Sequence, residues 1–224
     1  MNKLHKNPNI ATFSIVGRSK DGKQIGVAVA SKFLAVGSYV PAASTYGALA
    51  TQANTNMKLR IEGMRMLESG MSAQRVLNHF FETDIDRDTR QAGMIDAQGG
   101  VATFTGDRCK EWAGGCAESH AGAAYSIQGN LLSGPEVIQA MAEAWIASED
   151  ETSLGRRLLL ALEVGDNAGG DRRGRQASAL YVVEKDKGFN GLTDVSIDLR
   201  CDDSKNPVAE LKRLLALHES FFEG

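Results

Sequence analysis

The chain has 224 residues, with 28 acidic and 25 basic side chains and a formal net charge of −3. This near balance gives no electrostatic basis for binding nucleic acid or an anionic membrane surface, and no apolar run approaches the roughly 18 residues of a membrane span. Hydrophobic residues make up 42% and charged residues 24%. These proportions exclude a largely disordered chain and predict a soluble globular protein.

The cysteine content and the first residues indicate a compartment. Three cysteines, Cys109, Cys116 and Cys201, are an odd number, which argues against a closed disulfide framework and fits a reducing cytoplasm. Residues 1–11 lack the apolar segment of a secretory signal. We therefore expect a cytoplasmic protein in which residues 1–11 are an N-terminal extension and residues 12–224 form a single domain.

The first third of the chain predicts strands followed by a pair of helices. Strands are expected over 12–16, 24–31 and 46–52. Asp21-Gly22 between the first two is a hairpin signal, and the second is apolar on both faces, as in a strand buried on both sides. Helical spacing of apolar residues follows over 57–71, with Gly70 as a C-terminal stop, and a second helix begins after Ser72 as N-cap.

The remainder repeats this order. Further strands are expected over 91–96, 101–104, 123–128, 176–184 and 195–201. Helices are expected after a capping box at Ser133–Glu136, over 154–164 with Gly165 as its stop, and from Asn206-Pro207 to about Phe222. Hairpins dominate and parallel crossover units are scarce. The pattern therefore predicts stacked antiparallel sheets between layers of paired helices and not a Rossmann-type sheet.

The most unusual segment for chemistry is the loop over residues 165–176, which is rich in glycine, aspartate and arginine. Glycines let a backbone approach a ligand closely, and an arginine such as Arg175 can bind a carboxylate through two parallel hydrogen bonds. The alternative is a solvated helix-to-strand loop. The segment contains neither of the common glycine-rich phosphate-binding motifs.

Thr12 stands at the start of the first predicted strand, and Lys32 follows the end of the second. An N-terminal threonine can attack an amide carbonyl while its own α-amine, with a pKa near 7.7–8.0, accepts the hydroxyl proton. Lys32 could then stabilise charge at such a site. On these two residues alone, an ordinary strand threonine and a surface lysine are the simpler interpretation.

Metal and cofactor sites are not expected. Cys109, Cys116 and His120 have a spacing that matches no common zinc site, and the acidic segment 84–88 lacks the glycine and glutamate of a calcium-binding loop. We expect unreactive thiols, with Cys109 as nucleophile kept only as a weaker alternative. Asn130 follows a strand and is either a turn residue or a donor to an oxyanion.

Taken together, several segments resemble one family over residues 11–218. The segments are TFSIVGR, IGVAVASKFLAVG, ATQAN, FTGDRCKEWAG, QGNLLSGPEV, GDNAGGDRRGRQASAL and IDLRCDDSKNPVAELKRLL. In this order they resemble the DUF1028 family, which is regarded as similar to the N-terminal-nucleophile (Ntn) hydrolases. The resemblance implies an α+β fold, the four-layer αββα sandwich of proteasome subunits and penicillin acylases, with mostly antiparallel sheets.

The resemblance also implies amide-bond hydrolysis with Thr12 as nucleophile, no cofactor, and a small-molecule substrate. Residues expected around the pocket are Ser31, Lys32, Gln52, Asn130, Gly170, Asp171, Arg175 and Gln176. We assign Lys32 to electrostatic stabilisation, Asn130 to the oxyanion, Asp171 to orientation and Arg175 to a substrate carboxylate. The expected substrate is a small N-acyl or carbamoyl compound or a short peptide; the alternative is a non-catalytic small-molecule-binding protein on the same scaffold. A homodimer or higher assembly is expected.

The sequence departs from the family pattern at two places. Eleven residues precede Thr12, so its α-amine becomes available only after cleavage at Ala11-Thr12, either by autoproteolysis or by another protease. Gly115 stands where many members carry a histidine, which removes a potential imidazole.

Overall fold

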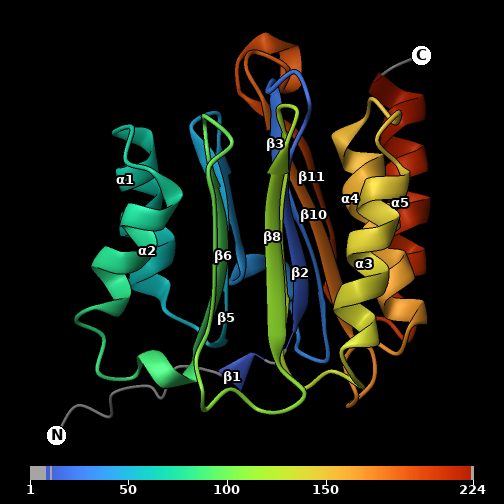
Figure 1. Cartoon of the computed structure of the whole chain (residues 1–224). Helices are drawn as coiled ribbons and strands as arrows, with labels where there is room; N and C mark the ends of the chain where they lie inside the picture. Colours follow the sequence, from blue (N-terminus) through green and yellow to red (C-terminus); the bar gives the residue numbers. More distant parts are fainter. Residues whose placement is uncertain (1–8, 11, 223–224) are drawn as a thin grey trace, which may run out of the picture.

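The computed structural model describes residues 9–10 and 12–222 and has four layers, as Figure 1 shows. Helices α1 (Met64–Glu68) and α2 (Ala73–Phe81) form one outer layer, and α3 (Glu136–Ala147), α4 (Leu154–Asn167) and α5 (Pro207–Phe222) form the other. Two antiparallel sheets lie between them. The expected α+β fold with an αββα sandwich is therefore confirmed.

The sheet beside α3–α5 has six strands in the order β11-β10-β3-β2-β9-β8. Their bounds are β2 (Phe13–Arg18), β3 (Gln24–Ser31), β8 (Gly114–His120), β9 (Ala123–Gly129), β10 (Ala177–Glu184) and β11 (Val195–Cys201). Strand β2 lies inside the sheet and pairs with β3 on one side and β9 on the other. The first residue of this strand therefore has neighbours on both sides.

The sheet beside α1 and α2 has the order β1-β5-β6-β7, with β4 also paired to β5. Its strands are β1 (Asn9–Ile10), β4 (Pro41–Ser44), β5 (Gly47–Asn54), β6 (Arg90–Asp96) and β7 (Val101–Thr105). Short helical segments lie between these elements. They are the 3-10 helices η1 (Val36–Ser38), η3 (Arg87–Thr89) and η4 (Phe189–Gly191) and the π-helix η2 (Leu59–Gly63).

Alternation along the strands divides the apolar side chains among three cores. On β2, Phe13 and Ile15 pack toward α3–α5. Val16 faces the opposite way, into the space between the two sheets. The third core joins the outer face of β5 and β6 to α1 and α2. Strands that are apolar on both faces, the pattern seen in β3, thus serve two cores at once.

The structure contains three strands that the sequence pattern did not predict, namely β1, β4 and β8. Strand β8 carries two glycines and mostly exposed polar residues, so its β propensity is low. Pairing with β9 stabilises it, through a hairpin turn in which Ala121 and Gly122 both have positive φ. Strand β4 is short and pairs with β5 in the same way.

The expected stop of the fourth helix at Gly165 is wrong, because α4 continues to Asn167. A Cβ at Gly165 would lie 2.5 Å from Met141 Cγ on α3. The glycine therefore permits close packing of α4 on α3, and the helix ends before Gly169 and Gly170, which adopt positive φ.

Two expected helix caps lack the side-chain contact that the sequence suggested. Neither Ser72 nor the segment Ser133–Glu136 places a side chain on the first backbone N–H groups of its helix. Pro135 is the N-cap of α3, and the Ser133 hydroxyl donates instead to the carbonyl of Ala168 at 3.4 Å. Ser133 therefore fixes the loop after α4 and not the start of α3.

A search of the described helices finds none with the length and apolar character needed to cross a membrane.

Candidate active site around Thr12

Thr12 lies immediately before β2 and is fully buried. Phe13 pairs with Ala30 on β3 and with Gly129 on β9. One step further along this register brings Thr12 between Ser31 and Asn130, so the structure places these three expected site residues together. The alternation of β2 also puts Thr12 on the same side as Ser14, facing the space between the two sheets.

The backbone carbonyl of Thr12 is held by two donors from different sheets. The Gln52 side chain donates from Nε2 at 3.2 Å, and the backbone N–H of Asn130 donates at 3.0 Å. Gln52 lies on β5, and Asn130 directly follows β9. Both sheets therefore fix the position of the residue expected to be the nucleophile.

Gln52 belongs to a buried network of side-chain amides and hydroxyls between the sheets. Its Nε2 also donates to Gln91 Oε1 at 2.9 Å and to the carbonyl of Gln128 at 3.2 Å, while its Oε1 accepts from the Ser14 hydroxyl at 2.7 Å. Gln128 Nε2 in turn donates to Ser14 Oγ at 2.6 Å. Because each member is both buried and hydrogen-bonded, the network specifies one arrangement of this end of the sandwich.

Gln91 and Gln128 are central to this network, and sequence reasoning missed both. Gln91 Nε2 donates to the carbonyl of Gly129 at 2.8 Å, and Gln91 Oε1 accepts from Asn130 Nδ2 at 2.9 Å. The available signal was a glutamine near the end of three separate buried strands, at positions 52, 91 and 128. A fully buried glutamine requires partners, so three at matching strand ends indicate a shared polar cluster.

Asn130 retains an unused acceptor beside Thr12. Its Nδ2 donates to Gln91, which fixes the orientation of the amide, yet its Oδ1 is buried with no hydrogen-bond partner among the described residues. An unsatisfied buried oxygen costs about 1–3 kcal/mol. A hydrogen bond to Asn130 Oδ1 would remove this cost. The donor could belong to a bound molecule or to the neighbouring chain after a change in its structure.

Asp171 is buried and positions the backbone at Lys32. Its Oδ2 accepts from the Lys32 backbone N–H at 3.0 Å, and its carboxylate forms an ion pair with Arg173 at 2.6 Å. The exposed Lys32 ammonium donates to the carbonyl of Arg175 at 3.3 Å. The structure therefore joins Asp171, Lys32 and the arginine-rich loop at the end of β3, next to Ser31.

The remaining expected residues are Gly170, Arg175 and Gln176, and their side-chain or backbone contacts differ. Gly170, with φ 49°, packs so closely that an added Cβ would be 3.1 Å from the ring of Phe13. Arg175 forms a two-oxygen ion pair with Asp166 at 2.7 and 2.9 Å. The Gln176 side chain donates to Asp203 at 3.2 Å. Gly170 thus adjoins the residue after Thr12, whereas Arg175 and Gln176 have partners of their own.

The short strand β1 passes the same end of the sandwich before the chain enters β2. Asn9 and Ile10 pair with Asn54 and Ala53 of β5. Ala53 has φ 62° although it is not glycine and is buried, a conformation that costs free energy and often accompanies functional sites. Asn9 and Ile10 therefore pair with the end of β5, and Ala53 directly follows Gln52 in that strand.

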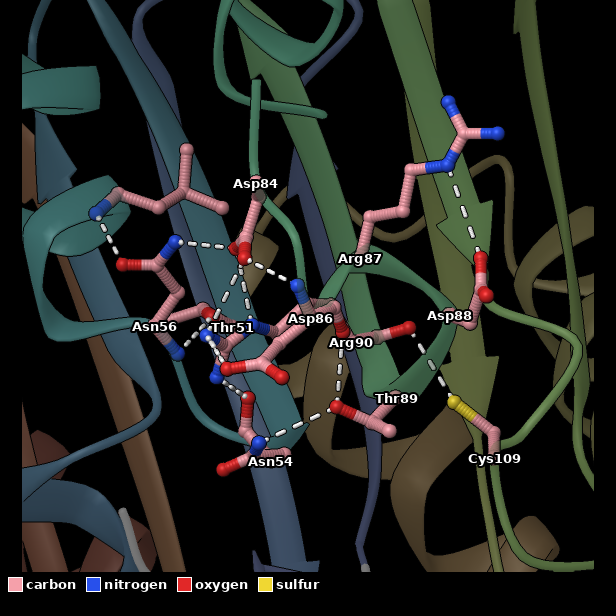
Figure 2. Close-up of polar contacts among 11 residues, drawn as sticks. Thr51, Asn54, Asn56, Asp84, Asp86, Arg87, Asp88, Thr89, Arg90 and Cys109 are labelled. Carbon is pink, nitrogen blue, oxygen red and sulfur yellow. Dashed lines mark hydrogen bonds and ion pairs between the residues drawn. The ribbon is translucent and has the colours of Figure 1, made fainter. Parts of the chain in front are cut away.

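Figure 2 shows how this end of β5 is anchored. Arg90 donates from Nη1 to the carbonyl of Asn54 at 2.6 Å and from Nε to Asp84 at 2.9 Å. Asn56 also donates to Asp84, at 3.0 Å. Burial raises the pKa of Asp84, but the hydrogen bonds from Arg90 and from the Asp86 backbone outweigh it and leave that pKa below its usual value.

The thiols are poorly suited to nucleophilic chemistry. Cys109 is buried and its Sγ donates to the carbonyl of Arg90 at 3.2 Å, as drawn in Figure 2. Burial raises the pKa of Cys109, and it does the same for Cys116 and Cys201. A raised thiol pKa lowers the fraction of thiolate at neutral pH, so the geometry disfavours the alternative in which Cys109 attacks a substrate.

Comparison with known proteins identifies a family and solved structures of similar fold. The sequence model of a family of unknown function, DUF1028, matches residues 12–211. The crystal structure of a DUF1028 protein from Silicibacter pomeroyi superposes with a TM-score of 0.79 at 29% sequence identity, covering 93% of this chain and 89% of that one. No curated protein matches the chain.

Proposed function

This chain belongs to the DUF1028 family, and from that premise we propose that it is an Ntn-type amidohydrolase in which Thr12, once cleaved from Ala11, is the nucleophile. The observation that carries the proposal is the position of Thr12. It is a buried threonine at the start of an inner strand, facing the space between two sheets, with its carbonyl held by Gln52 and Asn130.

In the proposed reaction the Thr12 hydroxyl oxygen attacks the carbonyl carbon of a substrate amide, and the free α-amine of Thr12 takes the hydroxyl proton. The tetrahedral oxyanion collapses, the amine leaves with that proton, and an ester to Thr12 remains. Water then hydrolyses the ester. An α-amine suits this role because its ordinary pKa lies close to neutral pH.

Asn130 supports both the oxyanion and the amine in this proposal. One hydrogen of its side-chain amide is used by Gln91, and the other is available to a developing oxyanion, as expected from the sequence. Its unpartnered Oδ1 supplies an acceptor for the α-amine or for the substrate N–H. A single amide that is fixed by Gln91 thus provides a donor and an acceptor beside Thr12.

On the substrate side, Lys32 supplies positive charge and Asp171 holds the Lys32 backbone in place. Ser31 and Gly170 adjoin the same end of β2 and β3. Arg175 is proposed to bind a substrate carboxylate by exchanging it for Asp166. The Arg175 side chain is 43% exposed and can reach a ligand, whereas Asp166, which is 14% exposed, has to turn toward solvent when its partner leaves.

The proposal requires cleavage of the Ala11–Thr12 peptide bond. In the autoproteolytic route the Thr12 hydroxyl attacks the Ala11 carbonyl carbon, the bond to the Thr12 nitrogen breaks, and the nitrogen gains the hydroxyl proton as the ester forms. Water then releases residues 1–11 as a carboxylate. Cleavage by another protease gives the same product, so the Thr12→Ala variant distinguishes the routes: it stays full length in the first and is shortened in the second.

The proposal is tested with a general acylating probe, a β-lactone, which needs no knowledge of the substrate. The test protein carries a site-specific protease site ending immediately before Thr12, so that the α-amine is released after purification. We expect the mass of one ring-opened probe on Thr12 of the cleaved protein and none on the uncleaved protein. Thr12→Ser should react and Thr12→Ala should not.

A second candidate is a non-catalytic small-molecule-binding protein on the same scaffold. The observation that favours it is that the Thr12 nitrogen is in a peptide bond in this sequence, with β1 paired beside it. It predicts thermal stabilisation by a ligand, lost on Arg175→Ala, with no product formed and no acylation of Thr12 after cleavage.

A further inference from the structure

A pocket lies at the corner of the sandwich where β4 packs over β3 and β10. It has a volume of about 360 Å³, within the range of small-molecule sites. One wall is formed by the end of η1, by β4 and by η2, and the floor by β10 and the edge strand β11. Its lining includes Ser38, Arg60, Ala179, Tyr181, Asp198 and Arg200.

Arg60 is the feature that points to a ligand. Its guanidinium is half-buried and uses one of its five N–H donors, from Nε to the carbonyl of Pro41 at 2.9 Å. Among the described residues it has no carboxylate partner. Burial lowers the pKa of Arg60, and the nearby Tyr181 offsets this only in part. A desolvated, unpaired guanidinium is costly, and an oxyanion bound through its free fork would offset that cost.

The floor of the pocket adds further donors and one acid. Arg200 pairs with Asp198 at 3.6 Å, and both side chains are nearly half exposed, so this ion pair is weak and Arg200 can turn toward a ligand. Burial raises the pKa of Tyr181, so its hydroxyl stays protonated at neutral pH and can donate. The charged residues of the pocket are Arg60, Arg200 and Asp198, so its net charge is +1.

We propose that this pocket binds a small organic anion, with Arg60 as the principal contact to a carboxylate or phosphate group and Tyr181 and Arg200 as additional donors. The apolar part of the ligand would lie against Pro41, Ala42 and Ala179. The site is separate from Thr12: Thr12 lies beside β3 and β9, whereas the pocket floor is β10 and β11. The proposal therefore does not depend on catalysis by Thr12.

The test is a nuclear magnetic resonance titration of the nitrogen-15-labelled full chain, with inorganic phosphate in one series and succinate in another. Ionic strength is kept constant with chloride. We expect saturable shifts of the backbone amides of Ser38, Ala179 and Arg200 with at least one of the two probes. Saturation by phosphate alone identifies a phosphate site, saturation by succinate alone a carboxylate site, and saturation by both a general oxyanion site.

Variants decide whether Arg60 is responsible. Arg60→Met should weaken binding about tenfold or more, because a charge-assisted hydrogen bond to the anion is lost. Arg60→Lys keeps the charge and loses the planar guanidinium. Its affinity for the anion should therefore lie between those of Arg60→Met and the parent. The matched control is Arg75→Met, which removes an exposed arginine of α2 and should bind as the parent does.

Two results would overturn the proposal: shifts that stay linear up to the highest concentration of both probes, or equal affinities for the parent and Arg60→Met. If Arg60→Met loses the dispersed spectrum of a folded protein, Arg200→Gln replaces it. Arg200 is exposed, so this variant should fold, and it should weaken binding about threefold through loss of one donor. Unchanged affinity in Arg200→Gln then counts against the site.

Discussion

The side-chain amide of Gln52 donates to the backbone carbonyl of Thr12 at 3.2 Å, and this bond joins the two sheets of the sandwich. Thr12 precedes a strand of the six-stranded sheet, and Gln52 lies on a strand of the other. The same Gln52 amide also donates hydrogen bonds to the Gln91 side chain and to the backbone carbonyl of Gln128. The position of Thr12 is thus coupled to a buried polar network and not only to its own strand.

Replacing Gln52 by leucine tests this coupling. The variant leaves the Ser14 hydroxyl without its acceptor and removes a donor from Thr12 and from Gln91. Since each unsatisfied buried group costs about 1–3 kcal/mol, we expect the free energy of unfolding to fall by about 2–4 kcal/mol in urea titrations. Gln74→Leu, at an exposed glutamine of α2, should change it by less than about 0.5 kcal/mol. Equal values for the two variants would refute the structural role of the network.

A substitution at Gly93 tests the same network by crowding the Gln128 side chain. An added Cβ at this position of β6 would overlap the side-chain amide of Gln128. We expect Gly93→Ala to displace Gln128 and destabilise the protein by about 1–3 kcal/mol, as overpacked sites do. Gly70→Ser is a contrasting case, since an added Cβ there meets nothing within 4 Å and only the positive φ opposes it. A Gly93→Ala protein as stable as the parent would show that Gln128 can move without loss.

Local patterns predicted most of the fold because the strands have clear apolar patterns. The segment Gln24–Ser31, which is apolar on both faces, became β3, and Val195–Cys201, which alternates, became β11, both with unchanged bounds. The prediction failed where stability comes from pairing: β8 is polar and glycine-rich and depends on β9. It failed again at Gly165, where a glycine that packs against Met141 resembles a helix stop.

The family resemblance singled out Thr12, Ser31, Gln52 and Asn130. The register of β2 brings Thr12, Ser31 and Asn130 together, and a hydrogen bond from the other sheet adds Gln52; their roles stay predictions. Gln91 was missed, because a lone glutamine in a strand gives no sign of which other strands will supply its partners. The ion pair of Arg175 with Asp166 likewise joins residues whose spacing of nine carries no helical or strand signal.

Asp84 should make stability depend on pH. Its pKa is lowered in the folded protein, so it contributes stability at pH values above its unfolded pKa of about 4, and this contribution is lost as the pH falls through the folded value. At pH 7, Asp84→Asn should cost about 3 kcal/mol because it breaks a buried pair with Arg90. The difference from the parent should shrink below about pH 4.

The control for Asp84 is Asp88→Asn. Asp88 is 46% exposed and pairs with Arg87 and Arg108 only at 3.6 and 3.8 Å, so its loss should cost less than about 1 kcal/mol. Urea titrations at several pH values between 3 and 7 measure both variants. A difference between parent and Asp84→Asn that does not decrease on acidification would contradict the proposed role of the carboxylate.

Cys109 should resist alkylation in the folded protein. Its thiol is buried and hydrogen-bonded to the carbonyl of Arg90, and burial raises its pKa. We expect peptide masses after iodoacetamide treatment at pH 7 to show no label on Cys109 over the time in which a denatured sample is labelled at all three cysteines. Rapid modification of Cys109, together with loss of reactivity toward the β-lactone, would support the alternative in which Cys109 is the nucleophile.

The most direct measurement is the mass of Thr12-containing peptides after the β-lactone has reacted with protein cleaved immediately before Thr12. Retention of the fold after cleavage is checked by the same urea titration as above. The account predicts one probe per chain, attached at Thr12, absent from the uncleaved chain and from Thr12→Ala. Folded, cleaved protein whose Thr12 stays unmodified at saturating probe would contradict the assignment of Thr12 as nucleophile and favour the binding protein instead.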